Sequence, residues 1–282
     1  MSKTTIPTTI PGALPSAKSI PESAAGVGAS FVPFGPKMGS KLFTGQNSTD
    51  VTQLGLGSSF DVSETSNEGS FRLSDVHDTD TLKAISFTPE GDRLFAAHSY
   101  QGKLAQYELS TPFDITTTSF FSAKNFTEIS YFLFSNRGTK MVVYYNIDGT
   151  DSSAAFQEFD VPNGRIANAS PVAQAELGGD PQGMALDRES QERFFFCTYD
   201  GAVIKVETGD PLSLSGATST QIFYASPHLR DMSFNADGSS LFLLTDSGDI
   251  IAYDLEKKYD PSVKEKKGQS SFSDRTEAIA FN

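Results

Sequence analysis

One acidic stretch of the sequence has the residue types that bind a divalent cation. Residues 75–80 have the sequence DVHDTD, with three carboxylates and a histidine. A Ca²⁺ loop needs oxygen ligands at alternate positions and a glycine for its sharp turn, and this stretch has no glycine. Residues 146–151, NIDGTD, have the glycine but are not followed by the acidic twelfth ligand. We interpret both stretches as solvated loops, and we expect no metal and no other cofactor.

Nucleophilic and phosphate-binding chemistry has no motif in this chain. The sequence contains no G-x-S-x-G nucleophile elbow, no G-x-x-x-x-G-K-[ST] phosphate loop and no G-x-G-x-x-G. The single cysteine, Cys197, follows three phenylalanines, so we expect it to be buried and inert. The histidines, His77, His98 and His228, lie far apart in the sequence. We therefore predict that the protein is not an enzyme and has no catalytic residue.

The best candidates for surface binding are aromatic residues in expected turns. Tyr100, with His98 two residues before it, and Tyr199 fall in two equivalent β-hairpin turns, which would place them on one face of the fold. Exposed tyrosine rings stack on sugars or anchor protein partners. The alternative is that these rings only pack over a neighbouring sheet.

A repeated strand–turn–strand pattern must position these residues. Residues 84–95 (AISFTPEGDRLF) and 231–242 (DMSFNADGSSLF) each show apolar–polar alternation, a glycine turn and a second apolar run. This is the pattern of a β-hairpin. Apolar positions after the hairpins recur at intervals of 52, 47 and 47 residues, at Tyr107, Phe159, Val206 and Tyr253. A unit of about 50 residues with three to four short strands is typical of a β-propeller blade.

The two ends of the repeat region look like parts of one unit. Residues 277–282 copy the first strand of a unit and then stop, whereas residues 36–70 contain its remainder. We predict an all-β fold, a β-propeller of five blades, in which residues 275–282 join residues 36–70 in one split blade and remove an exposed sheet edge. Six blades are the alternative, if residues 30–34 form an inner strand of their own. The whole blades are expected at residues 81–125, 127–177, 181–224 and 229–272.

Residues 1–30 are expected to form an extended N-terminal arm outside the propeller. They are rich in Thr, Pro, Ser, Ala and Gly, and their prolines exclude a continuous helix or a central strand. Such a segment alone cannot bury enough apolar surface to offset the entropy of ordering it. It is therefore either a disordered tail or an arm that lies on its own domain or on a neighbouring chain. For the arm, we predict assembly contacts through Ile6, Pro7, Ile10, Pro11, Leu14 and Ile20.

Composition excludes several classes of partner and site. The chain has 282 residues, enough for a substantial core, and a net charge of −13. This acidity argues against nucleic acid or an anionic membrane surface as the partner. A single cysteine excludes an intrachain disulfide and any multi-cysteine metal site. With no run of 18 apolar residues and no apolar segment at the start, we expect no membrane span and no signal peptide.

Part of the repeat resembles a known family. The run FTPEGDRLF at residues 87–95, followed by YELSTPFDITT at residues 107–117, resembles β-propeller repeats of marine tailed phages and some bacterial surface proteins, distant relatives of YVTN and lactonase-type propellers. The resemblance covers residues 36–282 in five degenerate copies. Phe60, Phe113 and Tyr259 replace the tryptophan of the family pattern. The pattern consists of turn and core residues, so it implies the fold and says little about function.

The resemblance also brings an enzyme alternative. Lactonase-type propellers bind a metal in the central channel through Glu, Asn and Asp residues at the ends of inner strands. Here Lys83, Asp231 and Glu277 lie near corresponding positions, and Asp231 and Glu277 could converge near the axis. Solvated strand ends are the simpler interpretation, because no set of three or four carboxylates is evident. A metal bound in the channel would discriminate between the two.

We therefore predict a non-enzymatic structural and interaction protein, a phage virion component of the tail, fibre or capsid. Its arm would contact other virion structural proteins, and its propeller would face a glycan or protein of the host surface. Its location would be the virion, after synthesis in the host cytoplasm. One alternative is a lactonase-like or glycan-processing enzyme with a channel metal. Another is a cytoplasmic scaffold whose acidic ring binds a basic partner, which a monomer with a mobile arm would favour.

Overall fold

A computed structural model describes residues 29–31, 40–45, 50–56, 65–73, 82–88, 90–98, 102–126, 128–146, 154–225, 228–235, 237–247, 249–262 and 264–271. These residues form five four-stranded antiparallel sheets. The four strands of each sheet are consecutive in the sequence, and each strand pairs with the next. We call each sheet a blade and number the blades along the chain.

The strands of the five blades have the following bounds. Blade 1 contains β1 (Ala29–Phe31), β2 (Lys41–Gly45), β3 (Asp50–Leu56) and β4 (Thr65–Arg72). Blade 2 contains β5 (Leu82–Phe87), β6 (Arg93–His98), β7 (Lys103–Leu109) and β8 (Thr118–Asn125). Blade 3 contains β9 (Glu128–Phe134), β10 (Lys140–Asn146), β11 (Ala154–Asp160) and β12 (Ser170–Ala175). Blade 4 contains β13 (Pro181–Leu186), β14 (Arg193–Thr198), β15 (Ala202–Glu207) and β16 (Thr218–Tyr224). Blade 5 contains β17 (Leu229–Phe234), β18 (Ser240–Thr245), β19 (Asp249–Leu255) and β20 (Lys264–Ser271).

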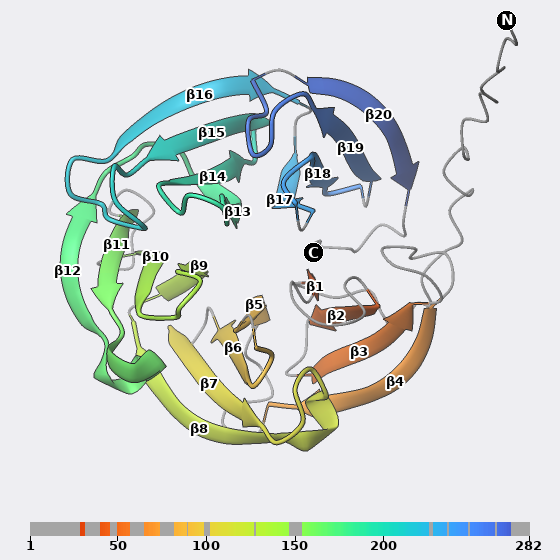
Figure 1. The fold of residues 1–282 in the computed structure, drawn as a ribbon, viewed down its shortest axis with the longest axis vertical. Coiled ribbons are helices and arrows are strands. Elements are labelled where there is room, and N and C mark those ends of the chain that lie inside the picture. The colour runs from red at the N-terminus through yellow and green to blue at the C-terminus, as the bar shows by residue number, and fades with distance from the viewer. Residues whose placement is uncertain are drawn as a thin grey trace, which may run out of the picture.

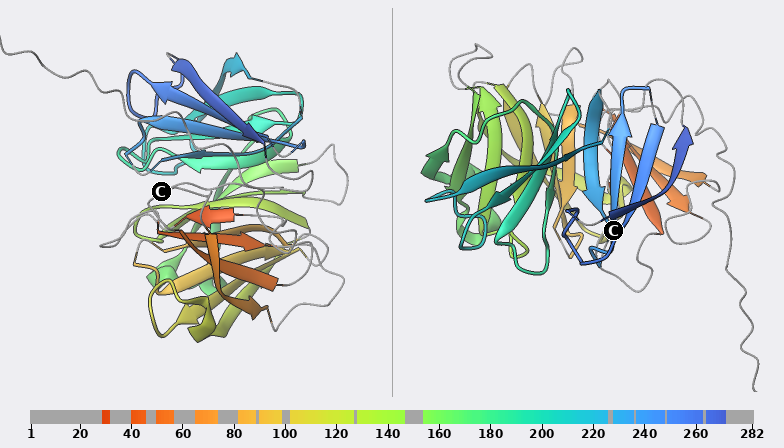
Figure 2. Two further views of the ribbon diagram at one scale, coloured as in Figure 1. Left: turned by 90° about the vertical axis from the view of Figure 1, so that its right-hand side faces the viewer. Right: turned by 90° about the horizontal axis from the view of Figure 1, so that it is seen from above.

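The blades are arranged in a ring around a common centre (Figure 1). The first strand of each blade lies nearest the centre and the fourth lies on the outside (Figure 1). Seen edge-on, the strands run across the thickness of the ring (Figure 2). The predicted all-β propeller architecture is thus confirmed. No helix among the described residues has the length and apolar character needed to cross a membrane.

The inner edge of blade 1 differs from the prediction of a split blade. β1 pairs with β2 and takes the inner position of that sheet, so the segment around residue 30 adds no separate blade. Residues 275–282, which were predicted to fill this position, lie outside the described residues, as do residues 1–28 with the predicted arm contacts. Ring closure by residues 275–282 therefore stays a prediction.

The core lies in the seams between neighbouring blades. One cluster joins blades 1 and 2, and it includes Phe43, Leu82 and Tyr107. Three further clusters join blades 2 and 3, 3 and 4, and 4 and 5 in the same way. Both faces of a middle strand contribute, which is why β14 carries five consecutive buried residues from Phe194 to Thr198. Burial raises the pKa of the Cys197 thiol well above its usual value, and nearby Asp231 adds to this effect, so the predicted inert cysteine is confirmed as buried.

The glycine of the hairpin motif is required by an aromatic ring. Gly91, with φ of +73°, lies under Phe113, and a Cβ placed on Gly91 would be 2.3 Å from the ring. Phe113 N donates to Gly91 O at 2.9 Å, which ties the two turns together. Gly238 and Tyr259 repeat this arrangement in blade 5. In blade 3, Gly138 has φ of +64° but nothing within 4 Å of its Cβ position, because no aromatic residue covers it.

Three seams share a hydrogen bond from one blade to the next. Gln53 of blade 1 accepts from Ile115 N at 3.0 Å, and Gln106 of blade 2 accepts from Ile166 N at 3.1 Å. The same bond joins blades 3 and 4, where Glu158 accepts from Leu214 N at 2.8 Å. The donors lie in the segments before the outer strands, where η2 (Ile115–Thr117) and η5 (Ile166–Asn168) are short 3-10 helices. All three acceptors are buried, so the bonds satisfy backbone groups that water does not reach.

The seam between blades 4 and 5 lacks this bond for a chemical reason. The position equivalent to Gln106 is Lys205, which is paired with Glu207 at 2.8 Å on the surface. The position equivalent to Leu214 is Pro261. Each comes two residues after a residue with positive φ, Leu212 in blade 4 and Tyr259 in blade 5. Proline has no N–H to donate, so an acceptor at position 205 would have no partner there.

The outer strands carry one β-bulge each. The unpaired residues are Glu68 in β4, Phe121 in β8, Val172 in β12, Ile222 in β16 and Lys267 in β20. A bulge bends and twists an edge strand, which hinders pairing with another chain.

Candidate ligand-binding site

Each of blades 2 to 5 has a β-bulge at the same position of its inner strand. In β5, for example, Leu82 and Ala84 pair with β6 but the residue between them does not. The unpaired residues are Lys83 in β5, Ser130 in β9, Gln182 in β13 and Arg230 in β17. All four are polar and partly exposed. Bulges redirect a side chain and are frequent beside functional sites, so these four positions are candidates for binding.

Core packing explains why the bulges form. Leu229 and Met232 belong to the same core cluster although they are three residues apart. In a regular strand, residues three apart point to opposite faces of the sheet, so only an extra residue lets both reach the same core. Leu82 and Ile85 show the same spacing in blade 2. The extra residue in blade 5 is Arg230, so its side chain does not follow the alternation of side chains between the two faces of the sheet. Its strand, β17, borders the centre of the ring (Figure 1).

Arg230 lies against the predicted binding residue Tyr199 of the neighbouring blade. Its guanidinium is over the Tyr199 ring, with the central carbon 5.1 Å from the ring centroid. Tyr199 is in the turn between β14 and β15 and is 39% exposed, so its predicted position in an exposed turn is confirmed. A cation over a tyrosine face is held by the charge distribution of the ring. The two residues together form one polar and aromatic surface across the seam between blades 4 and 5.

His228 and Asp246 complete this surface. The ring of His228 packs edge-on against Tyr199, with 4.6 Å between centroids, and its Nδ1 is 3.8 Å from Asp246 Oδ2. The Tyr199 hydroxyl donates to the same carboxylate oxygen at 3.3 Å. Two hydrogen bonds hold the backbones of these residues together: His228 N donates to Tyr199 O at 2.6 Å, and Asp246 N donates to His228 O at 2.8 Å. We call Tyr199, His228, Arg230 and Asp246 the seam cluster.

A close backbone approach brings the inner strands of blades 4 and 5 together below the seam cluster. A Cβ on Gly183 would be 2.5 Å from the Asp231 Cα and 2.8 Å from Met232 N, so only glycine fits in β13 at this point. Asp231 also contributes to the environment of Tyr131 in β9. Burial, and then the negative charge of Asp231, raise the pKa of the Tyr131 hydroxyl, while Arg230 opposes the shift. The hydroxyl of Tyr131 is therefore neutral at physiological pH.

The other predicted binding residues have different outcomes. His98 was predicted to be exposed with Tyr100, and this is wrong: it is the last residue of β6 and fully buried. The reason is that β6 is a middle strand, paired with β5 and β7 along its edges and covered by neighbouring blades on its faces. Tyr100 lies outside the described residues. Of the charged residues considered for a channel metal, Lys83 and Asp231 lie on inner strands as predicted, whereas Glu277 lies outside the described residues.

No group of three or more metal-ligating side chains occurs within the part of the chain that the structure describes. The acidic stretch at residues 75–80 and most of residues 146–151 fall outside it.

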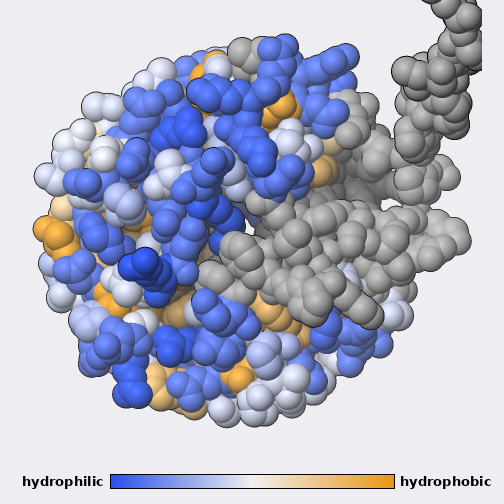
Figure 3. Space-filling view, viewed as in Figure 1, coloured by the Kyte–Doolittle hydropathy of each residue, from blue (hydrophilic) through white to orange (hydrophobic). Residues whose placement is uncertain are grey.

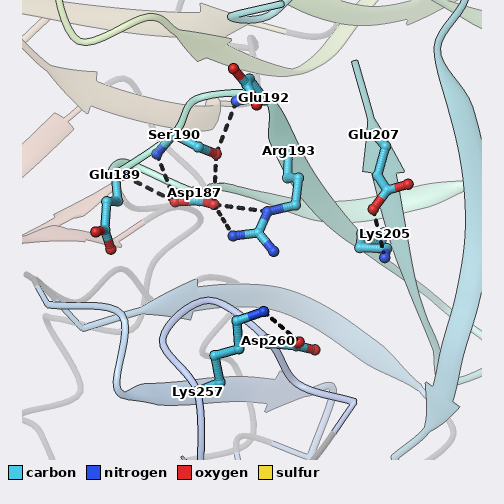
Figure 4. Close-up of polar contacts among 9 residues, drawn as sticks. All are labelled: Asp187, Glu189, Ser190, Glu192, Arg193, Lys205, Glu207, Lys257 and Asp260. Atoms are coloured by element: carbon cyan, nitrogen blue, oxygen red, sulfur yellow. Dashed lines mark hydrogen bonds and ion pairs between the residues drawn. The ribbon is translucent and has the colours of Figure 1, made fainter. Parts of the chain in front are cut away.

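A second charged cluster, around Asp187, is used by its own turn. Asp187 is fully buried and accepts from Glu189 N at 3.0 Å, from the Ser190 hydroxyl at 2.9 Å and from Arg193 Nε at 2.9 Å (Figure 4). Every contact is made within a hairpin of blade 4, so the carboxylate closes the turn between β13 and β14. Hydrophilic side chains cover most of the described surface on the face shown in Figure 3, with apolar residues only in scattered places.

Sequence reasoning missed Arg230, His228 and Asp246. His228 and Asp246 are neighbours of Tyr199 only through the seam, 29 and 47 residues away in sequence. The one available signal was the polar character of Lys83, Gln182 and Arg230 at equivalent places just inside the inner strands.

Comparison with known proteins identifies the class of fold. No family model matches the chain, and no curated protein matches its sequence. Among solved structures, a Lactobacillus plantarum protein has a TM-score of 0.53 at 8% identity and covers 85% of this chain and 70% of its own. The β-propeller domain of Cps50 (Swd1) from Myceliophteria thermophila has a TM-score of 0.50 at 11% identity, covering 87% and 72%.

A Bacteroides fragilis protein, provisionally assigned as a 6-phosphogluconolactonase, has a TM-score of 0.49 at 14% identity and covers 85% of this chain and 70% of its own. That score is too low to support a conclusion. Together, the first two likenesses and the ring of blades show that the chain folds as a β-propeller. At these identities, they show the fold alone.

Proposed function

We propose that this β-propeller is a non-enzymatic structural and interaction protein. The observation that carries the proposal is the seam cluster, where a partly exposed arginine and an exposed tyrosine are held in place without being used to close a turn. Arginine and tyrosine are the residue types that dominate binding energy at protein surfaces. The Asp187 cluster offers a contrast, because its carboxylate is fully engaged by its own hairpin.

We further propose that the protein is a virion component, attached to other structural proteins by residues 1–30. The support is the likeness of its repeats to propellers of tailed phages and the proline-rich character of the arm, whose only charged side chains are Lys3, Lys18 and Glu22. In this role, the propeller is the part that faces outward, and its partner is a glycan or protein of the host surface.

Limited trypsin digestion tests the arm. Lys3 and Lys18 are cleavage sites within residues 1–30, and Lys205 in a middle strand is an internal control that should resist cleavage throughout. We expect release of the peptide ending at Lys18 from the isolated chain and protection of the same bond in native particles. Protection in the isolated monomer would assign the arm to the protein's own fold. Equal cleavage in both samples would also contradict the proposed anchor.

Closure of the ring by the C-terminal strand is tested by two truncations. Closure by residues 275–282 requires their deletion to lower the melting temperature much more than deletion of residues 1–20, whereas a ring closed by β1 alone requires similar melting temperatures. Differential scanning calorimetry of the two truncated chains measures this. Equal melting temperatures would show that residues 275–282 do not close the ring.

A further inference from the structure

The guanidinium of Arg230 is positioned but not paired. It lies over the ring of Tyr199, and no hydrogen bond or ion pair joins it to another group within the described part of the chain. An arginine carries five N–H donors and stays charged at every physiological pH. The bulge in β17 sets the direction of the side chain, and the tyrosine ring restricts its rotation. An arginine held in this way is ready to bind an anion.

No carboxylate among the described residues bonds the guanidinium, and two aspartates of this region have other partners. Asp231 accepts from Met232 N at 2.7 Å and lies against Gly183 of the neighbouring blade. Asp246 accepts from Tyr199 at 3.3 Å and lies 3.8 Å from His228. An incoming anion would therefore not have to displace an internal partner of Arg230.

We infer that the seam cluster binds a sugar that carries a carboxylate, that is, a uronic acid. The inference rests on the proposed interaction function and names its ligand. The planar fork of a guanidinium matches a carboxylate with two parallel hydrogen bonds. The side chains of His228 and Asp246 are 51% and 35% exposed beside it and can bond neighbouring hydroxyl groups of the sugar.

Charge favours a uronic acid over an acidic peptide. The chain has a net charge of −13, Asp231 follows Arg230 in β17, and Asp246 bonds the same Tyr199 that Arg230 lies over. A peptide rich in Asp and Glu would bring several negative charges to this surface, and only one of them could bond the guanidinium. A uronic acid brings one carboxylate, and its hydroxyls can donate to the aspartate instead of repelling it.

The experiment is a titration of the full chain with sodium D-glucuronate, followed by two-dimensional NMR at neutral pH. We expect a dissociation constant of about 1 mM, the range for a ligand of this size. D-glucose, which lacks the carboxylate, should bind at least tenfold more weakly. Arg230→Gln should weaken glucuronate binding at least tenfold, and Arg230→Lys should weaken it as well, because lysine keeps the charge but loses the fork.

Arg165 provides a matched control. Its guanidinium lies over the ring of Phe121 at 4.9 Å, in another seam, so Arg165→Gln removes an equivalent cation–aromatic contact away from the site. This variant should bind glucuronate within twofold of the unchanged chain. Circular dichroism of all variants checks that the propeller is folded.

Three results would overturn the inference. Equal binding of glucose and glucuronate would show that the carboxylate is not recognised. Unchanged binding by Arg230→Gln would place the ligand elsewhere. Binding of glutamate as tight as that of glucuronate would assign the site to acidic peptides. Because the titration uses the isolated chain, its failure would leave the trypsin result on the arm, and with it the proposed assembly role, standing.

Discussion

Gly91 and Gly138 occupy the same turn in two blades, and we expect the same substitution to have different effects on them. Both have a left-handed backbone, with φ of +73° and +64°. At Gly91, a Cβ would be 2.3 Å from the ring of Phe113, whereas at Gly138 it would have no neighbour within 4 Å. The pair therefore separates the cost of backbone conformation from the cost of a steric clash.

The two costs can be estimated separately. An alanine with positive φ costs roughly 1 kcal/mol, and this applies equally to Gly91→Ala and Gly138→Ala. Forcing an extra methyl group into occupied space adds about 1–3 kcal/mol. The ring of Phe113 packs against the core cluster of blades 1 and 2, with 5.8 Å between its centroid and that of Phe87, so moving it away would lose that contact. We expect about 1 kcal/mol of destabilisation for Gly138→Ala and about 2–4 kcal/mol for Gly91→Ala.

Equilibrium urea unfolding, followed by circular dichroism, measures both free energies. A double substitution supplies a further test. Phe113→Ala removes the ring, so adding Gly91→Ala to it should cost only the conformational part, about 1 kcal/mol. Equal destabilisation by the two glycine substitutions in the otherwise unchanged chain would refute the steric explanation. So would an unchanged cost of Gly91→Ala after the ring has been removed.

Three further predictions concern the seam bond of Gln106, the thiol of Cys197 and the carboxylate of Asp260. Gln106→Leu should lower the free energy of unfolding in urea by about 1–3 kcal/mol, because it leaves a buried N–H of the next blade unpaired. Lys205→Leu, at the equivalent position of blade 4, should change it by less than about 0.5 kcal/mol. Similar values for the two variants would show that the seam bond contributes nothing. Cys197 should resist iodoacetamide in the folded chain and react in urea, since burial raises its thiol pKa; modification without unfolding would contradict its burial. A hydrogen bond from the Ser262 hydroxyl holds the pKa of Asp260 below its usual value, so its contribution to stability is present above the pKa of an unfolded aspartate and is lost as the pH falls through the folded pKa. The urea concentration at the unfolding midpoint should decrease as the pH is lowered below about 4, and it should decrease less steeply in Asp260→Asn. Identical pH profiles of the two chains would contradict this.

The fold could be predicted from the sequence because its repeat is built on local rules. The hairpins at residues 84–95 and 231–242 follow from alternation and a turn glycine, and both form as predicted. The inner edge of blade 1 was predicted only in part: residues 30–34 were considered as the inner strand of a sixth blade, whereas the three-residue β1 takes the inner position of blade 1 itself.

The candidate site was only partly within reach of sequence reasoning. Tyr199 was found because a turn position predicts exposure. His98 lies in the equivalent hairpin but is the last residue of β6 and not a turn residue, and it is buried like Thr198, the last residue of β14. Arg230 escaped notice because its position depends on a bulge, and the bulge arises from core packing at Leu229 and Met232 rather than from a sequence signal of its own.

At Lys205 and Pro261 both the acceptor side chain and the donor N–H of the seam bond are absent, and this affects how the blades of such a protein can be exchanged. An acceptor side chain in one blade and a donor N–H in the next have to be kept or lost together, so the partners of a seam are matched across 56 to 62 residues of sequence. A blade moved to a new position would be separated from the donor of one seam hydrogen bond and from the acceptor of another. For duplication, deletion or grafting of parts of this chain, a unit that keeps a seam bond therefore has to include the third strand of one blade and the segment before the outer strand of the next.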